Sequence, residues 1–113
     1  MNEQKLKSYI RRFVANARAI VSYQVGLPLG CTKMMKILSW IENEDKEAAK
    51  FPVFEEYFRA TIDLPTGPER LHYSREALRR YDERLVTINL RYREEIIDAC
   101  FKIIERYGER KVD

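Results

Sequence analysis

The stretch Ser74–Gly108, SREALRRYDERLVTINLRYREEIIDACFKIIERYG, decides the fold of this 113-residue chain. Its apolar residues recur in the three- and four-residue steps of one helical face, with a period of about 3.6 rather than the 3.5 of a coiled coil. Ser74 suits the N-cap, and Gly108 is placed to end the helix. We therefore expect one C-terminal helix, about 50 Å long if continuous. A helix of that length must project, be broken, or be covered by two shorter helices stacked end to end.

The residues before this stretch predict three more helices. A first helix over residues 3–24 is marked by apolar residues at 6, 9, 10, 13, 14, 17, 20 and 21. A second begins at residue 28 or 30 and ends in the acidic run 42–45, and a third covers residues 52–62 before a loop rich in Pro and Gly. Because no segment alternates like a strand, the sequence predicts an all-α bundle of four to five helices with a long C-terminal helix.

Composition predicts one folded domain over residues 1–113, since 45% of the residues are hydrophobic and 35% are charged. The longest uncharged stretch, residues 19–32, is too short to span a membrane, and the N-terminus starts charged and has no apolar signal-peptide core. We expect a cytoplasmic protein that does not engage a membrane. Cys31 and Cys100 lie among apolar neighbours and are interpreted as reduced and buried, with a disulfide between them as the alternative.

Charge is segregated along the chain, although the net charge is only +3. Residues 1–40 hold seven Lys and Arg against one Glu, a net of +6, whereas residues 41–58 hold six acids against two Lys, a net of −4. The first helix accordingly carries a positive outer face, made by Lys5, Lys7, Arg11, Arg12 and Arg18. This face has three interpretations: a solvated surface neutralised by the acidic segment 42–47, a contact for RNA or DNA phosphates, or a contact for an acidic protein.

The inventory of reactive groups argues against an enzyme and against a cofactor. His72 is the only histidine, and one His with two separated Cys gives no zinc spacing. The four glycines are dispersed, so no phosphate-binding loop is present. An enzyme that uses Asp63, Arg70 and His72 is the remaining catalytic hypothesis.

Binding is the function that the surface residues favour. Tyr and Arg are enriched at binding hot spots, and Tyr23, Tyr73 and Trp40 are the aromatic residues that the helical stripes do not place firmly in the core. Asn89 interrupts the last stripe, so it must find a hydrogen-bond partner or face solvent. The candidate partner-binding residues are Glu42, Glu44, Asp45, Glu47, Glu55, Glu56, Trp40, Tyr73, Asp63, Arg70 and His72.

The loop Asp63-Leu-Pro-Thr-Gly-Pro-Glu-Arg70, followed by Ala77-Leu78, Asp82, Arg93 and Ala99-Cys100, carries a resemblance. It resembles small all-helical bacterial proteins with an Asp-x-Pro-x-Gly-x-x-Arg loop before a long C-terminal helix, a group without established catalytic residues. In size and helical build the chain is also similar to immunity proteins of bacterial toxin–immunity pairs, including those of contact-dependent inhibition. The positive net charge departs from the acidity of many nuclease inhibitors, which leaves residues 42–47 and 55–56 to face a basic toxin.

We therefore expect a non-enzymatic protein-binding module, an immunity- or antitoxin-like protein that binds and neutralises a bacterial toxin. The alternative is a nucleic-acid-associated regulator that uses the basic face of the first helix. A last helix that overshoots its own domain would also allow pairing with a second copy, as a homodimer.

Overall fold

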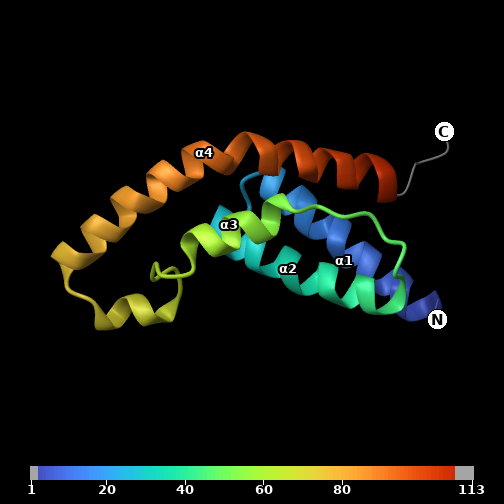
Figure 1. The fold of residues 1–113 in the computed structure, drawn as a ribbon, viewed down its shortest axis with the longest axis horizontal. Coiled ribbons are helices and arrows are strands. Elements are labelled where there is room, and N and C mark those ends of the chain that lie inside the picture. The colour runs from blue at the N-terminus through green and yellow to red at the C-terminus, as the bar shows by residue number, and fades with distance from the viewer. Residues whose placement is uncertain (1–2, 109–113) are drawn as a thin grey trace.

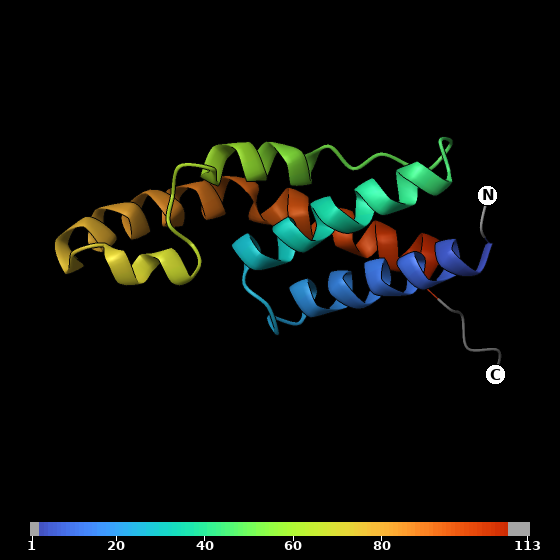
Figure 2. The same ribbon diagram turned by 90° about the horizontal axis from the view of Figure 1, so that it is seen from below.

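Four α-helices and one short 3₁₀ helix make up the fold in the computed structural model, which describes residues 3–108 (Figure 1). The elements are α1 (Glu3–Val21), α2 (Leu27–Glu44), α3 (Val53–Thr61), the 3₁₀ helix η1 (Pro68–His72) and α4 (Arg75–Tyr107). Successive helices run in opposite directions (Figure 2). Packing joins α1 to α2, α2 to α3, α3 to α4 and α4 back to α1. The described residues thus form an all-α, up-and-down bundle, as the sequence predicts.

One core lies where all four helices meet. Its most deeply buried side chains come from every α-helix and are Phe13, Ile20, Cys31, Met34, Phe54, Tyr57, Ile96, Cys100 and Ile103. Both cysteines are buried and free, as expected from their apolar neighbours. The buried residues of α4 all fall between Ile96 and Ile103, so only the C-terminal half of this helix belongs to the core.

The N-terminal half of α4 projects beyond the bundle, and the helix is continuous (Figure 1). Of the three arrangements left open by the sequence, projection is the one found. Ser74 caps the helix, since its hydroxyl oxygen accepts a hydrogen bond of 3.1 Å from the Ala77 N–H. Where Asn89 interrupts the apolar stripe, its Oδ1 accepts a hydrogen bond of 2.6 Å from the Tyr57 hydroxyl. That bond ties α3 to the middle of α4.

The loop before α4 folds back along the projecting half, and η1 is an element that the sequence analysis missed. We define the arm as residues 63–90, which comprise this loop, η1 and the projecting half of α4.

None of the helices within residues 3–108 is long and apolar enough to cross a membrane.

Helix α1 ends three residues before the predicted residue 24, and it does so without a glycine. The Tyr23 N–H donates to the Ile20 carbonyl and the Gln24 N–H to the Ala19 carbonyl, which is the pattern of a Schellman motif. Tyr23 occupies its left-handed position with φ of 61°, a conformation that strains a residue with a Cβ. Its side chain is 74% exposed, so little packing offsets the strain.

Replacing Tyr23 with Gly is expected to stabilise the protein by about 0.5–1 kcal/mol, because Gly adopts this backbone conformation without the Cβ penalty. The measurement is the free energy of unfolding in urea. Tyr23→Ala is the control, since it removes the ring and keeps the strain; an equal gain from both variants would contradict this explanation.

Candidate functional site

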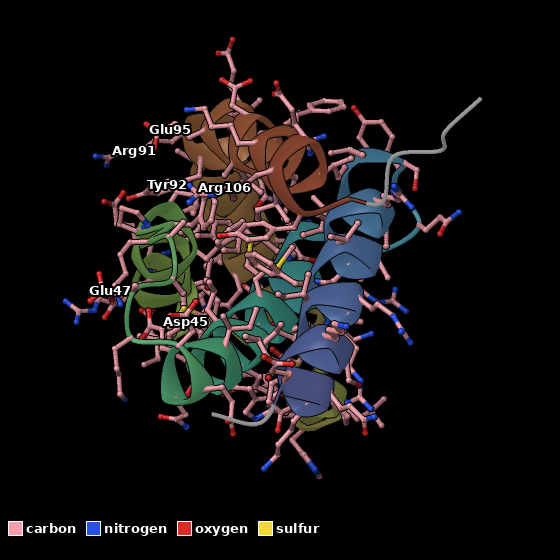
Figure 3. The ribbon with its side chains drawn as sticks, turned by 90° about the vertical axis from the view of Figure 1, so that its right-hand side faces the viewer. Asp45, Glu47, Arg91, Tyr92, Glu95 and Arg106 are labelled. Carbon is pink, nitrogen blue, oxygen red and sulfur yellow. The ribbon has the colours of Figure 1, made fainter. Side chains whose placement is uncertain are left out.

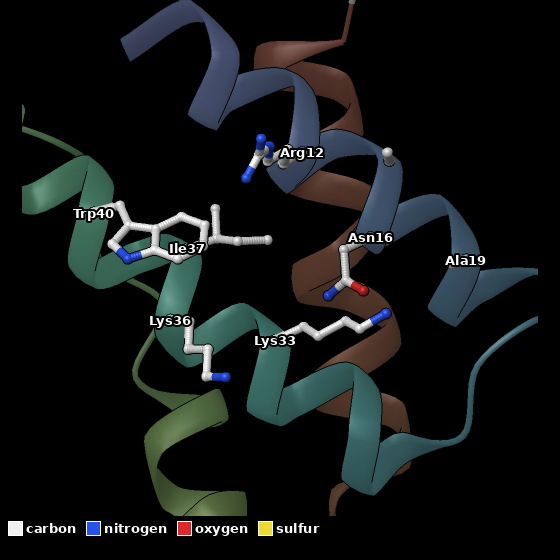
Figure 4. Close-up of a pocket in the computed structure, with 8 residues that line it drawn as sticks. Arg12, Asn16, Ala19, Lys33, Lys36, Ile37 and Trp40 are labelled. Carbon is white, nitrogen blue, oxygen red and sulfur yellow. The ribbon is translucent and has the colours of Figure 1, made fainter. Parts of the chain in front are cut away.

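A groove of about 430 Å³ lies between α1 and α2 (Figure 4). Its residues follow helical spacing on both sides, so each helix contributes one face. They are Arg12, Ala15, Asn16 and Ala19 from α1, with Lys33, Lys36, Ile37 and Trp40 from α2. The three cationic side chains thus converge on a hollow whose remaining walls are mostly apolar.

Close contact between the two helices supports this groove. The Asn16 amide donates a hydrogen bond of 2.9 Å to the Gly30 carbonyl, and Asn16 is the only polar residue among the buried side chains described. A Cβ on Gly30 would lie 2.6 Å from Cγ1 of Ile20, so glycine is required for this approach. Nearby, Ala15 and Ala19 present only methyl groups, which leaves open space beside the contact.

Trp40 forms the aromatic end of the groove. Its indole is half-buried and packs against Tyr9 with ring centroids 5.3 Å apart. The guanidinium of Arg12 lies over the same indole, 5.9 Å from its centroid. One aromatic plane and one exposed cation therefore share this end of the groove.

A second hollow of about 480 Å³ flanks α1 on its other side, toward the end of α4. It is lined by Lys7, Ile10, Arg11, Val14, Ala15, Arg18 and Tyr107. Ala15 lines both hollows, so they adjoin at its methyl group on the crest of α1. We name the two hollows and this crest the basic face.

The cations of the basic face lack ion-pair partners among the residues that the structure describes. Within residues 3–108, no ion pair is formed by Lys7, Arg11, Arg12, Arg18, Lys33 or Lys36. Of the predicted first-helix cations, Lys5 differs, because its ammonium lies 3.8 Å from a carboxylate oxygen of Glu44. The interpretation that the acidic segment 42–47 neutralises this face therefore holds for Lys5 and not for the other described cations. Lys33 and Lys36 were not singled out from the sequence, because their position beside α1 depends on how α2 packs.

The predicted acidic surface is largely occupied within the chain. Glu42 pairs with Lys50 at 3.0 Å, and Glu55 pairs with Arg59 one helical turn later at 2.8 Å. Asp45 accepts a hydrogen bond of 3.0 Å from the Glu47 N–H. Figure 3 shows Asp45 and Glu47 on the loop side of the bundle, away from the outer face of α1. The Glu47 carboxylate and Glu56 on α3 are exposed and form no ion pair among the described residues, so only part of the predicted acidic surface is unpaired.

The charged loop residues fasten the loop to the projecting half of α4. The Arg70 guanidinium makes two hydrogen bonds to the Asp82 carboxylate, at 2.8 and 3.0 Å, and a third to the Pro65 carbonyl. Asp63 pairs with Arg84 at 3.0 Å. These arginines hold the pKa of both carboxyl groups below the usual range of aspartate.

The other loop candidates are exposed. His72 closes η1 with its side chain in solvent, while Asp63 and Arg70 are engaged with α4 and do not orient it. Tyr73 is 42% exposed and packs edge-on against Tyr81, with ring centroids 5.5 Å apart. The loop thus presents structural ion pairs rather than an assembled acid–base set.

The two cysteine thiols are buried in surroundings that suppress their reactivity. Burial raises the pKa of the Cys31 and Cys100 thiols to about 12, so both stay protonated at neutral pH. No group of three or more His, Cys, Asp and Glu side chains in the described part of the chain is arranged to hold a metal ion.

Comparison with known proteins gives one match. A family model described as "Protein of unknown function (DUF2489)" matches residues 2–103, nearly the whole chain. No curated protein and no solved structure matches the chain.

Replacing Gly30 with Ala is expected to destabilise the protein by about 1–3 kcal/mol, because the new methyl group overlaps the buried Ile20 side chain. This loss runs against the gain of about 1 kcal/mol that Gly→Ala brings in an ordinary helix interior. Urea unfolding measures it. Gly26→Ala is the control, since its Cβ would meet only Pro28 Cδ at 3.8 Å; a stabilised Gly30→Ala variant would contradict the close approach of α1 and α2.

Proposed function

We propose that the chain, which belongs to the DUF2489 family, is a non-catalytic module that binds nucleic acid through its basic face. The observation that carries the proposal is the gathering of Lys7, Arg11, Arg12, Arg18, Lys33 and Lys36 around two hollows without an ion-pair partner among the described residues. Unpaired cations that share a face repel one another, and a polyanion removes that repulsion. Binding to phosphates would also release the condensed counterions of the nucleic acid.

Aromatic residues between the cations favour nucleic acid over an acidic protein. Trp40 lies at the end of one hollow and Tyr107 in the wall of the other. The carboxylates of an acidic peptide engage only the cations, whereas every nucleotide of a nucleic acid offers both a phosphate for Lys and Arg and an aromatic base for Trp and Tyr. Both helices that carry the face are anchored in the core through Phe13, Ala17 and Met34, so the cations are displayed on a rigid support.

Binding to RNA or DNA is expected to weaken steeply with salt. For single strands, each phosphate contact contributes about −0.7 to the slope of log K against log salt. A variant with Arg12→Gln, Lys33→Gln and Lys36→Gln loses three contacts, so the slope should become shallower by about 2 and binding at low salt should fall roughly tenfold or more. Fluorescence anisotropy of a labelled strand measures both quantities.

The matched control removes the same charge from the arm, through Arg75→Gln, Arg79→Gln and Arg80→Gln. It should keep the wild-type slope, because these residues lie at the far end of α4 from the basic face (Figure 1). Equal losses in both variants would show a non-specific charge effect and contradict the proposal. Polyglutamate that competes as well as nucleic acid would instead assign the face to an acidic protein.

A second candidate function is the toxin-neutralising one, and the arm is what favours it. Its exposed apolar side chains include Leu71 at 88%, Leu90 at 73% and Val86 at 57% exposure. Apolar groups on a projecting element are typical of protein contacts. In this proposal the arm, and not the acidic segment 42–47, supplies the apolar centre of the interface.

The toxin hypothesis predicts that Leu71→Ser and Leu90→Ser together abolish protection while leaving the fold unchanged, because both side chains are exposed. The assay co-expresses the chain with candidate toxic domains encoded in neighbouring reading frames and measures cell growth. Ser replacements at Leu29 and Phe101, which are exposed apolar residues outside the arm, serve as the control. Absence of protection by the wild-type chain would exclude this candidate.

A further inference from the structure

The α1–α2 groove is built differently from a site for phosphate alone. Its cations, Arg12, Lys33 and Lys36, are exposed, whereas Ile37 is buried and Trp40 is half-buried. A backbone phosphate needs only the cations. An apolar, aromatic wall inside a cationic rim matches a nucleotide, whose base is flat and apolar on its faces and whose phosphate is charged.

The Trp40 indole is held in a position that suits stacking with a flat aromatic ring. Contact with Tyr9 holds the indole in place, so stacking on it costs little conformational entropy. Arg12 lies over the indole at 5.9 Å, and its side chain is long and exposed. It can therefore rotate off the ring to meet a phosphate, which exposes the indole to a base as the phosphate is bound.

The crest of α1 offers a path from one hollow to the other. Ala15 is exposed, and it is the one residue that lines both of these hollows, with a side chain that is only a methyl group. Arg11, Arg12 and Arg18 lie within one turn of it on α1. A sugar–phosphate backbone can cross the helix here with cations on both sides, and Tyr107 lines the hollow at the far end of the path.

From these observations we infer that the basic face binds a single-stranded nucleic acid, with one unpaired base stacked on Trp40 and the backbone crossing α1 at Ala15. This inference rests on the proposed function and narrows it. A duplex keeps its bases paired and stacked, so it can touch the rim of the groove and cannot fill it. The shared ligand chemistry is an unpaired nucleotide strand, from RNA or DNA.

The single tryptophan of the chain makes the inference directly measurable. Intrinsic fluorescence is recorded while single-stranded RNA, single-stranded DNA, the DNA duplex of the same sequence, and heparin are added in turn. A single strand should quench Trp40 emission and protect it from acrylamide. The duplex and heparin should bind at low salt without that protection. The RNA and DNA arms identify which strand the groove prefers.

Variants test the two contacts separately, with anisotropy of a labelled strand as the readout. Trp40→Leu should weaken single-strand binding roughly tenfold, since stacking of one base contributes on the order of 1–3 kcal/mol, and Trp40→Phe should restore most of it. Ala15→Leu should weaken single-strand binding several-fold without changing the charge, while Ala15→Ser should not. Because Ala15 is exposed on a helix, its variants keep the fold even where those of Trp40 lose stability.

The outcomes separate this inference from the proposed function. Equal binding of all polyanions, unchanged Trp40 emission and wild-type affinity in Ala15→Leu would overturn the single-strand inference and leave nucleic-acid binding standing. Lack of binding to every polyanion at low salt would overturn the proposed function itself. Selective quenching by a single strand together with loss in Ala15→Leu supports both.

Discussion

The close approach of α1 and α2 at Gly30 is the constraint on which the rest of the account depends. The missing Cβ lets Ile20 pack directly on the second helix, and the buried Asn16 amide seals the contact by donating to the Gly30 carbonyl. A buried amide left without a partner would cost about 1–3 kcal/mol, so this hydrogen bond also selects the pairing of the two helices. With that pairing in place, Arg12 faces Lys33 and Lys36 across a shared groove.

The charge distribution follows from the same packing. Acids near the end of α2 form ion pairs with nearby cations, Glu42 with Lys50 and Glu44 with Lys5. Two ion pairs also form within the arm, where Arg70 binds Asp82 and Arg84 binds Asp63. On the outer side of α1 and α2, by contrast, the cations of the basic face form no ion pair within the described residues, which gives a mildly basic protein a distinctly basic face.

Sequence periodicity and capping residues were sufficient to predict the helices and the two ends of α4 at Ser74 and Gly108, because amphipathic spacing and capping chemistry act locally. They placed the end of α1 too late, since a Schellman motif with Tyr23 in the left-handed position has no glycine to mark it. Sequence periodicity could not predict the groove, for a different reason. Arg12 and Trp40 were each recognised as candidates. Their contact across two helices depends on tertiary packing, as does the pairing of Arg70 with Asp82, so local sequence patterns do not predict either contact.

The most direct test of the central claim is a map of backbone amide chemical shifts while a short single-stranded nucleic acid is titrated into the labelled protein. The account predicts that the largest changes cluster on α1 and α2 around Arg12, Asn16 and Lys36, together with the indole N–H of Trp40, and that they diminish as salt is raised. Changes confined to the arm, or no changes at low salt, would contradict it.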